Sequence, residues 1–319
     1  MRRVEIAEYG GIEGLRIVEA PLPEPRRGEL LVRVRAIGVN PKDAMVRKGK
    51  FAFLTGRPPT GLGHDFAGEV IKAPARSGYA EGDRVFGMIN DLSGRAYAEY
   101  VRVSPDEMAK MPAQLSFEEA AAIPLAAQTA LQALRDLGKL DLGKSGKGSG
   151  KRVFIHGASG GVGVFAIQIA RALGAEVTAS SSAANRGLCL ELGAGAHVDY
   201  REQPPESIRD SFDVFFDVFG NQSLKKVSGA LAEDGVYINT IPDGRVIKEV
   251  ARTLLSRKRA KLVIVRSRAA QLEALSGMVE RGQLRSVVAA VLPLSEVHEA
   301  HRLIESRRTR GKIILDPSR

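Results

Sequence analysis

Short runs of alternating hydrophobic and polar residues dominate the first third of the chain. Residues 29–37 read Glu-Leu-Leu-Val-Arg-Val-Arg-Ala-Ile, and shorter runs of the same kind lie at 68–71, 83–86 and 96–101, separated by Gly and Pro. Such runs are typical of β-strands, because successive side chains of a strand point to opposite faces. The pattern therefore predicts a β-rich lobe, which we interpret as a distorted barrel.

The pattern changes at Ser116, where a helical period begins. Ser116 precedes Glu118 and Glu119 and suits the N-cap of an Ala-rich helix that continues to Leu137 and is interrupted at Pro124.

From Lys151 onward, short apolar runs alternate with stretches of helical period. Strands are predicted at 153–155, 176–179, 197–199, 212–218 and 235–240, and helices at 162–173, 185–192 and 223–232. This alternation is typical of a doubly wound parallel sheet, so the fold class is α/β. A last helix is predicted at 294–305 and a last strand at 311–315, and we expect that strand to return to the first lobe.

Composition and length agree with a globular protein of two domains. The chain has 319 residues, 44% of them hydrophobic and 26% charged. We place one domain at 1–123, completed by 290–319, and the other at 124–289. Because Cys189 is the only cysteine, an intrachain disulfide and a zinc site of several cysteines are excluded. The sequence contains neither a signal core nor an apolar run of about 18 residues, so we expect a cytoplasmic protein without a membrane span.

The charge is strongly positive. Lys and Arg number 47 against 37 Asp and Glu, a formal net charge of +10, which favours anionic partners such as nucleic acid, a membrane surface or a phosphorylated small molecule. Residues 138–150 form a Gly-, Lys- and Ser-rich stretch that is predicted to be a surface loop. It holds no aromatic residue on which a base could stack, so nucleic acid is not the partner we expect.

A glycine-rich turn joins the first strand and first helix of the alternating region. Residues 153–163 read Val-Phe-Ile-His-Gly-Ala-Ser-Gly-Gly-Val-Gly, so that Ala158 replaces the first glycine of a G-x-G-x-x-G spacing. Backbone N–H groups and the positive end of a helix dipole stabilise a pyrophosphate where no side chain blocks its approach. The turn predicts a dinucleotide site at Ala158, Ser159, Gly160, Gly161, Val162 and Gly163.

The end of the second strand indicates which dinucleotide binds. An NAD site usually places an acid there for the ribose hydroxyls, whereas this chain has Ala179-Ser-Ser-Ser182 and no acid until Glu191. Hydroxyl groups and a nearby cation suit a 2′-phosphate. We therefore predict NADPH, held at Ser181, Ser182, Asn185 and Arg186; the alternative is a Ser-rich helix cap beside a solvated arginine.

Together these motifs resemble the medium-chain dehydrogenase/reductase superfamily, in its zinc-free, zeta-crystallin-like quinone oxidoreductase branch. The resemblance covers essentially the whole chain. Besides the glycine-rich turn, the matching segments are 36–43 (Ala-Ile-Gly-Val-Asn-Pro-Lys-Asp), 63–70 (Gly-His-Asp-Phe-Ala-Gly-Glu-Val), 82–87, 96–101, 121–131, 192–194, 199–201 and 311–315 (Gly-Lys-Ile-Ile-Leu).

The resemblance implies a GroES-like catalytic domain, a Rossmann NAD(P)-binding domain and a homodimer, for which 261–265 would be a suitable apolar edge strand. It also implies that Lys312 approaches the cofactor from the last strand, and that Tyr200 packs by the adenine. The residues that it places near the nicotinamide or ribose are Thr129, Phe219, Gly220 and Ile241.

The chain departs from its relatives at two places. Ala184 stands where they often carry a cation before the asparagine, and Ala44-Met45 stands where they often carry a Tyr or a Trp-Lys pair that can supply a proton.

Hydride chemistry without zinc needs a group that stabilises the charge developing on the acceptor oxygen. Asn40 is the first candidate, as a neutral amide donor to the substrate or the cofactor ribose. Asp43 is the second, and we expect it to brace its loop, so that water could supply the proton. His64 has no partner ligands for zinc in the sequence, and no metal is expected.

Two further candidates have simpler interpretations. His298 and His301 lie one turn apart and could bind a metal, but with no third ligand in the sequence an ordinary surface helix is favoured. Cys189 lies among leucines and is interpreted as a core residue rather than a nucleophile.

The leading hypothesis is an NADPH-dependent reductase of quinones or of activated alkenes such as enones and alkenals. The alternative is an NADPH-binding protein with little turnover that acts as a sensor, structural protein or RNA binder. The net charge and the missing proton donor keep that alternative open.

Overall fold

The computed structural model describes residues 1–141 and 150–319, so most of the loop predicted at 138–150 lies outside the described residues. The chain divides into two compact units, 1–128 with 266–319, and 129–265. Residues 266–289, predicted in the second domain, lie in the first unit, because helix α9 (Ala269–Glu280) packs on strand β8 (Met108–Lys110). No helix among the described residues is long and apolar enough to span a membrane.

The first unit is built on two sheets. One has the strand order β2-β1-β4, and the other has the order β15-β16-β3-β5-β6-β8 with β7 paired to β3. Their strands are β1 (Arg2–Ile6), β2 (Leu15–Glu19), β3 (Leu30–Val39), β4 (Thr60–Gly61), β5 (Asp65–Lys72), β6 (Arg84–Met88), β7 (Tyr100–Val103), β8, β15 (Val288–Pro293) and β16 (Lys312–Asp316). The helices of this part of the chain are α1 (Pro41–Arg47), α2 (Ala52–Thr55), α3 (Phe117–Ala121), α4 (Pro124–Leu131), which continues into the second unit, α9 and α10 (Val297–Glu305).

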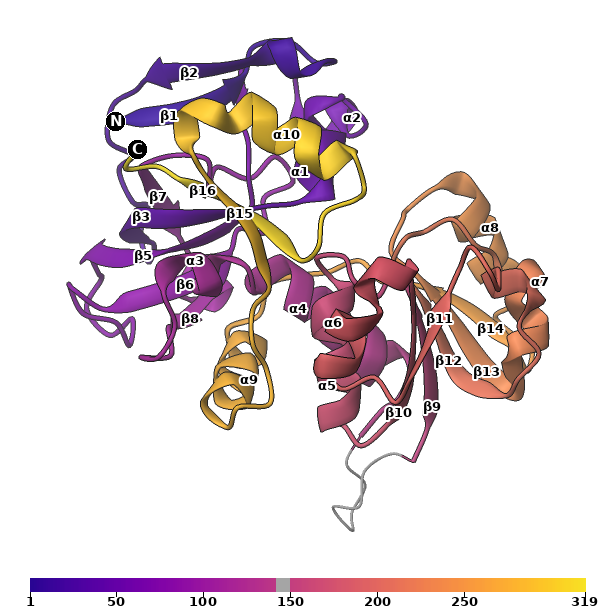
Figure 1. Ribbon diagram of the computed structural model, residues 1–319. Helices are drawn as coiled ribbons and strands as arrows, with labels where there is room; N and C mark the ends of the chain where they lie inside the picture. The colour runs from indigo at the N-terminus through magenta and orange to yellow at the C-terminus, as the bar shows by residue number, and fades with distance from the viewer. Residues whose placement is uncertain (142–149) are drawn as a thin grey trace. The chain divides into compact units, whose positions relative to one another are not determined.

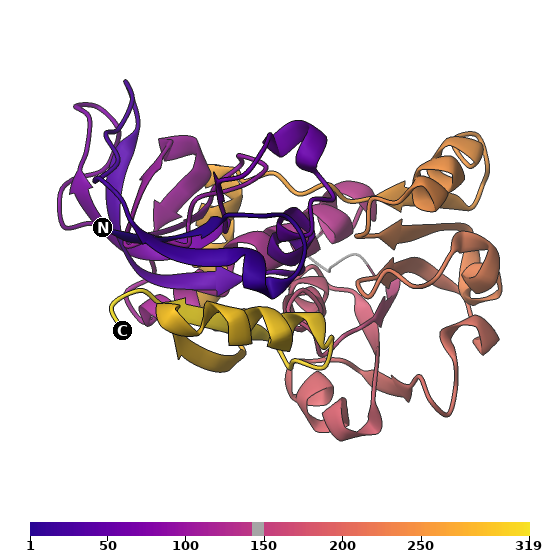
Figure 2. The same ribbon diagram turned by 90° about the horizontal axis from the view of Figure 1, so that it is seen from above.

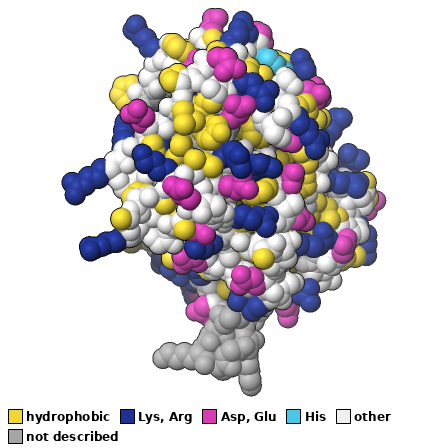
Figure 3. Space-filling view, turned by 90° about the vertical axis from the view of Figure 1, so that its left-hand side faces the viewer, with side chains coloured by type: hydrophobic (Ala, Val, Ile, Leu, Met, Phe, Trp, Pro, Cys, Tyr) yellow, Lys and Arg dark blue, Asp and Glu magenta, His cyan; other side chains and the backbone are white. Residues whose placement is uncertain are grey.

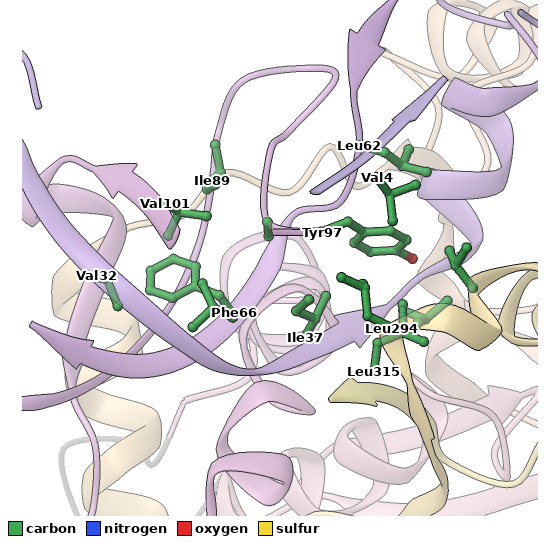
Figure 4. Packing of buried hydrophobic residues seen from close by; sticks show 14 of the residues in the cluster. Val4, Val32, Ile37, Leu62, Phe66, Ile89, Tyr97, Val101, Leu294 and Leu315 are labelled. Carbon is green, nitrogen blue, oxygen red and sulfur yellow. The ribbon is translucent and has the colours of Figure 1, made fainter. Parts of the chain in front are cut away.

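The hydrophobic core of the first unit lies between these sheets and α10. Along β3, Val32 and Val34 are buried while Arg33 and Arg35 are exposed, which is the alternation the sequence predicts. Figure 4 shows the side chains of Val32, Phe66 and Tyr97 among the apolar residues of this cluster.

The last strand completes the first unit, as predicted. β16 pairs antiparallel with β3, with Ile313 opposite Val39, and parallel with β15. Arg2 donates a hydrogen bond to the carbonyl of Pro317 (2.7 Å), and the two chain ends lie side by side in Figures 1 and 2. This unit is therefore formed by both ends of the chain.

The second unit is the predicted doubly wound sheet. Its strands are all parallel and follow the order β11-β10-β9-β12-β13-β14, which is the 3-2-1-4-5-6 order of dinucleotide-binding folds. The strands are β9 (Arg152–His156), β10 (Glu176–Ser181), β11 (Ala196–Asp199), β12 (Phe212–Asp217), β13 (Leu231–Asn239) and β14 (Arg259–Leu262). The helices are a π-helix (Gln132–Leu137), α5 (Gly163–Ala172), α6 (Arg186–Glu191), α7 (Leu224–Val227) and α8 (Gly244–Arg252). Figure 1 shows α5 and α6 on one side of this sheet and α7 and α8 on the other.

Two predicted elements differ from the observed ones. The helix predicted at 223–232 ends at Val227, because Leu231 is already paired with Phe212 in the sheet. The strand predicted at 96–101 begins only at Tyr100, since Ala98 forms an isolated bridge with Arg3.

Candidate functional site

The glycine-rich turn lies between β9, a central strand of the second unit, and α5. Gly157 has φ +81°, so this residue, rather than Ala158, supplies the left-handed backbone of the turn. The side chain of Ala158 is buried and its N–H donates to Ser180 O (3.0 Å). A Cβ on Gly163 would lie 2.3 Å from the carbonyl oxygen of Gly157. Gly157 and Gly163 are therefore required by the fold of the turn itself, and Ala158 contributes packing rather than a free donor.

Gly160 differs from these glycines because neither its backbone conformation nor its neighbours among the described residues require a glycine. Its φ is not positive, and an added Cβ would meet only the carbonyl oxygen of Gly157, at the ordinary contact distance of 3.4 Å. The first N–H groups of an α-helix have no partner within the helix, and α5 begins three residues later. Ser159, Gly161 and Val162 are all partly exposed around this point. The space at Gly160 and the helix terminus fit a pyrophosphate.

The end of β10 is tied to this turn through Asn185. Its Nδ2 donates to Ser159 Oγ (2.9 Å) and to Ser182 Oγ (3.2 Å), and its buried Oδ1 has no hydrogen-bond partner among the described residues. Ser181 is buried, and its hydroxyl contacts His197 Nε2 (2.8 Å). Of the two serines predicted to contact the 2′-phosphate, Ser182 is therefore partly exposed, while the hydroxyl of Ser181 is buried and engaged within the protein.

Sequence reasoning missed the contribution of the neighbouring strand. β11 lies parallel to β10 with Asp199 opposite Ser181, so an acid does stand at this strand end. Its carboxylate already accepts from Ala183 N (3.0 Å) and Arg201 N (2.9 Å). The signal available in the sequence was that the carboxyl ends of adjacent parallel strands meet at one edge of a sheet.

Two cations lie on the segments that follow these strands. Arg186 is exposed at the start of α6, and its charge, after burial, contributes to lowering the pKa of His197. Arg201 lies with its guanidinium 5.9 Å from the ring centre of Tyr200, which in turn meets His156 edge-on at 6.2 Å. Arg201 is thus a second cation at the end of the sheet, which the sequence analysis did not select.

Asp217, at the end of β12, braces the loops at this edge. It is buried and accepts from Gly220 N (2.7 Å), Gln222 N (2.8 Å) and the hydroxyl of Tyr237 (2.9 Å). Burial and the negative charge of Asp217 raise the pKa of Tyr237.

Three residues named by the family resemblance, Phe219, Gly220 and Ile241, lie near this brace. Gly220 has φ +75°, and a Cβ there would lie 2.2 Å from Ile241 Cγ1, so glycine is needed for the two loops to pack. Phe219 remains 37% exposed, and Thr129 is buried on α4. The structure therefore brings Phe219, Gly220 and Ile241 together.

A buried polar cluster lies at the junction of β3 and α1 in the first unit. Asn40 is only 1% exposed, and its Nδ2 donates to Gly38 O (3.2 Å) and Asp65 Oδ2 (3.0 Å), while its Oδ1 accepts from Lys312 Nζ. Both amide hydrogens are engaged. The side chain of Asn40 therefore links the end of β3 to Asp65 and Lys312.

Asp43 completes a capping box with Asn40 and anchors two more elements. It accepts from Asn40 N (2.9 Å), His64 Nδ1 (2.7 Å) and the hydroxyl of Tyr97 (3.1 Å). Burial alone would raise the pKa of Asp43, but the hydrogen bond and charge of His64 lower it below its usual value. The ionised carboxylate braces its loop.

Asp65 and Lys312 carry the other charges of the cluster. Asp65 Oδ1 accepts from Leu125 N (2.8 Å), and its Oδ2 lies 3.4 Å from Lys312 Nζ, which also donates to Val39 O (3.1 Å). Burial raises the pKa of Asp65, and the charge of Lys312 opposes that shift. Lys312 is therefore held by its own unit through three acceptors.

Lys42 is a cation that sequence reasoning passed over. It follows Pro41 in α1, is half-buried, and its Nζ forms no hydrogen bond or ion pair within the part of the chain that the structure describes. Burial lowers the pKa of Lys42, whereas the negative charges of Asp43 and of other carboxylates act to raise it. A desolvated ammonium group whose pKa is lowered is a better proton donor than an ordinary lysine.

The residues present do not fit a zinc ion. Both ring nitrogens of His64 are engaged, by Asp43 and by the carbonyl of Leu92 (3.1 Å). No group of three His, Cys, Asp or Glu that could hold a metal is found within residues 1–141 and 150–319. Cys189 is buried in the second unit, where burial raises the pKa of its thiol.

His301 corrects one prediction, since it is buried rather than on an ordinary surface helix. Its ring meets Tyr97 edge-on at 6.0 Å, and neither ring nitrogen has a hydrogen-bond partner among the described residues. Burial lowers the pKa of His301 to about 4. A neutral ring that packs against Tyr97 explains its position.

Comparisons with known families agree with the observed fold. The alcohol dehydrogenase GroES-like domain family matches residues 26–113, and the zinc-binding dehydrogenase family matches residues 192–315.

Similar proteins match over almost the whole chain. The chloroplastic quinone-oxidoreductase homolog of Spinacia oleracea is 31% identical, with 99% of this chain and 98% of that protein covered. The 2-methylene-furan-3-one reductase of Solanum lycopersicum is 32% identical, with 99% and 79% covered. The crystal structure of the Escherichia coli quinone oxidoreductase complexed with NADPH is 26% identical, with 99% and 100% covered and a TM-score of 0.82.

Proposed function

The chain belongs to the medium-chain dehydrogenase/reductase superfamily, in its quinone oxidoreductase branch, and on that premise we propose that it transfers a hydride from NADPH to a quinone or an activated alkene. Bound NADPH supplies the hydride. The acceptor takes up this hydride and one proton, so that a quinone leaves as a quinol and NADP⁺ remains.

The space at Gly160 is the observation that carries the proposal. A glycine that the protein's own packing does not require lies beside the start of α5, at the carboxyl ends of parallel strands where dinucleotides bind. The buried Oδ1 of Asn185, which has no partner among the described residues, is a second group that a ligand hydroxyl can satisfy.

We assign the 2′-phosphate to Arg186 and Arg201, with Ser182 and Asn185 as neutral partners. Guanidinium groups suit phosphate because they offer several donors in a fixed fork. The negative carboxylate of Asp199 would repel this phosphate. That carboxylate already accepts hydrogen bonds from two backbone N–H groups, which reduces the repulsion. Tyr200 would pack by the adenine, and Thr129, Phe219, Gly220 and Ile241 would contact the nicotinamide or ribose.

We assign the donation of the proton to Lys42. The positioning of its loop is assigned to Asn40, Asp43 and Lys312. Lys42 follows the loop that these residues fix, and its lowered pKa favours release of a proton to the reduced acceptor. The reaction proposed is zinc-independent, since both ring nitrogens of His64 are engaged by Asp43 and the carbonyl of Leu92. A homodimer formed along β14, the edge strand of the parallel sheet, belongs to the same proposal.

The test is the oxidation of NADPH by the full-length protein with a panel of quinones, enones and alkenals, followed by the absorbance of the reduced nicotinamide. Cofactor binding is measured in parallel by the quenching or enhancement of nicotinamide fluorescence. We expect turnover with at least one acceptor class, and its loss in a Gly160→Val variant. Tight NADPH binding without turnover on any acceptor would favour the alternative of a binding protein that acts as a sensor.

A further inference from the structure

A pocket of about 460 Å³ lies at the amino-terminal edge of the parallel sheet. It is lined by residues that end the π-helix, precede β9 and begin β14. The lining residues that bear on the argument are Lys139, Lys151, Arg257, Arg259, Lys261 and Asp213. We call it the basic pocket.

The basic pocket carries an excess of positive charge. Five cationic side chains line it, against two lining carboxylates, Asp213 and Asp234. Arg257 is paired with Asp234 (3.2 Å) and with Glu233. Within the described ranges, no carboxylate forms an ion pair with Lys139, Arg259 or Lys261.

Two of these ammonium groups donate hydrogen bonds to backbone carbonyls of the same turn. Lys261 Nζ donates to Leu137 O (2.7 Å), and Lys151 Nζ donates to Gly138 O (3.0 Å) and Lys139 O (3.1 Å). Three consecutive carbonyls therefore gather cations from β14 and from the start of β9. A carbonyl group is neutral, so the hydrogen bond to Leu137 O leaves the positive charge of Lys261 uncompensated.

The cations of the basic pocket repel one another. Burial lowers the pKa of Lys261, and the charges of Lys139, Arg259 and Lys151 lower it further. A bound anion would relieve this repulsion and raise the pKa of Lys261 again. The repulsion between these cations is therefore unfavourable, and a bound anion would reduce it.

The basic pocket is separate from the proposed cofactor site. Lys151 directly precedes β9 and Arg259 begins β14, so the pocket lies where the strands start. The glycine-rich turn and Asp217 lie where strands end. Because the strands are parallel, these are opposite edges of one sheet.

We propose that the basic pocket binds a small polyvalent phosphate anion, such as a pyrophosphate group. Lys139, Arg259 and Lys261, which form no ion pair with a carboxylate among the described residues, suit an anion with several negative charges, and the volume is within the range of small-molecule sites. None of the residues lining the pocket is aromatic, so it offers no platform on which a base would stack. A small phosphate is therefore favoured over single-stranded nucleic acid.

Figure 3 shows Lys and Arg scattered over one face among Asp, Glu and apolar side chains. The basic pocket thus accounts for part of the net charge of +10, which one cofactor phosphate does not require.

The experiment is calorimetric titration of the full-length protein with inorganic pyrophosphate, with and without saturating NADPH. We expect one pyrophosphate site that persists with NADPH and weakens at least tenfold in Arg259→Gln/Lys261→Gln. The matched control is Lys225→Gln/Lys226→Gln, which removes the same charge from exposed positions of α7 and should bind pyrophosphate as the wild type does.

A second variant guards against misfolding of the β14 double variant. Lys139 is exposed and has φ +57°, which asparagine tolerates, so Lys139→Asn should weaken pyrophosphate binding while the thermal midpoint is kept. Displacement of all pyrophosphate by NADPH, or equal affinity in all variants, would overturn the proposal. It would also be overturned if a single-stranded oligonucleotide bound the same residues more tightly than pyrophosphate. None of these results depends on whether the protein reduces quinones.

Discussion

Lys312 Nζ donates a hydrogen bond to Asn40 Oδ1, although 272 positions separate the two residues in the chain. The same ammonium group faces the buried carboxylate of Asp65. Removing one partner of a buried ion pair leaves an uncompensated charge. We therefore expect Lys312→Met to lower the free energy of unfolding by roughly 3 to 5 kcal/mol, measured by urea denaturation.

The control for this substitution is Lys72→Met, at an exposed position of β5, which should change the free energy of unfolding by less than about 0.5 kcal/mol. Adding Asp65→Asn to Lys312→Met should recover part of the loss. Strictly additive losses in the double variant would contradict the pairing.

Substitutions at two glycines of the turn should affect ligand binding and stability separately. Gly160→Ala should keep the thermal midpoint of the wild type and weaken NADPH, because its Cβ would enter the space left for the pyrophosphate. Gly163→Ala should lower the midpoint, since its Cβ would lie 2.3 Å from a carbonyl oxygen. Differential scanning fluorimetry with and without NADPH measures both effects. Unchanged NADPH affinity in Gly160→Ala would remove the main support for the cofactor site.

Arg186 and Arg201 should determine the choice of dinucleotide. We expect Arg186→Ala and Arg201→Ala each to weaken NADPH by about tenfold, the value of roughly one charge-assisted hydrogen bond, and to leave NADH almost unchanged. Arg245→Ala, on the exposed face of α8, is the matched control. Equal losses for NADPH and NADH would refute the 2′-phosphate role.

Lys42 should affect turnover more than cofactor binding. We expect Lys42→Gln to lower kcat by about 10²-fold, the lower end of the usual effect of a general acid. Because the protonated amine is the active form, kcat of the wild type should fall as pH rises through the lowered pKa of Lys42.

The variant should lose this alkaline decrease, while Lys50→Gln, an exposed neighbour, should keep it. Unchanged kcat in Lys42→Gln would leave water as the proton source.

His301 should make the protein less stable in acid. Its pKa is about 4 in the folded protein, below the ordinary value, so the unfolded chain binds the proton more readily. The stability associated with neutral His301 is present above about pH 6.5 and is lost as pH falls toward 4, by roughly 3 kcal/mol.

His301→Phe should remove this pH-dependent part while keeping the aromatic contact with Tyr97. Urea denaturation at several pH values measures the difference, with His298→Phe on the same helix as the control. Identical pH dependence in wild type and His301→Phe would show that other groups are responsible.

The sequence allowed the fold class, the order of the elements and the glycine-rich turn to be predicted, since each depends on local periodicity and on residue types with definite backbone preferences. The environment of individual polar groups was not accessible in the same way. The burial of His301 depends on how α10 packs on the first unit, and the proximity of Asp199 to Ser181 depends on the register of two strands. Asn40 was selected as a candidate amide donor to the substrate or the cofactor ribose, and its partners inside the protein, Asp65 and Lys312, could not be predicted because they lie far away along the chain.

The position of β16 between β3 and β15 has a consequence for biosynthesis. On the ribosome, residues 129–265 are complete before the strand at 312–316 has been made, so the parallel sheet can fold while the first unit still lacks an inner strand. Until then, the edge of β3 lacks its antiparallel partner, and Asp65 lacks the ammonium group of Lys312. The lobe that is translated first is therefore the lobe that matures last.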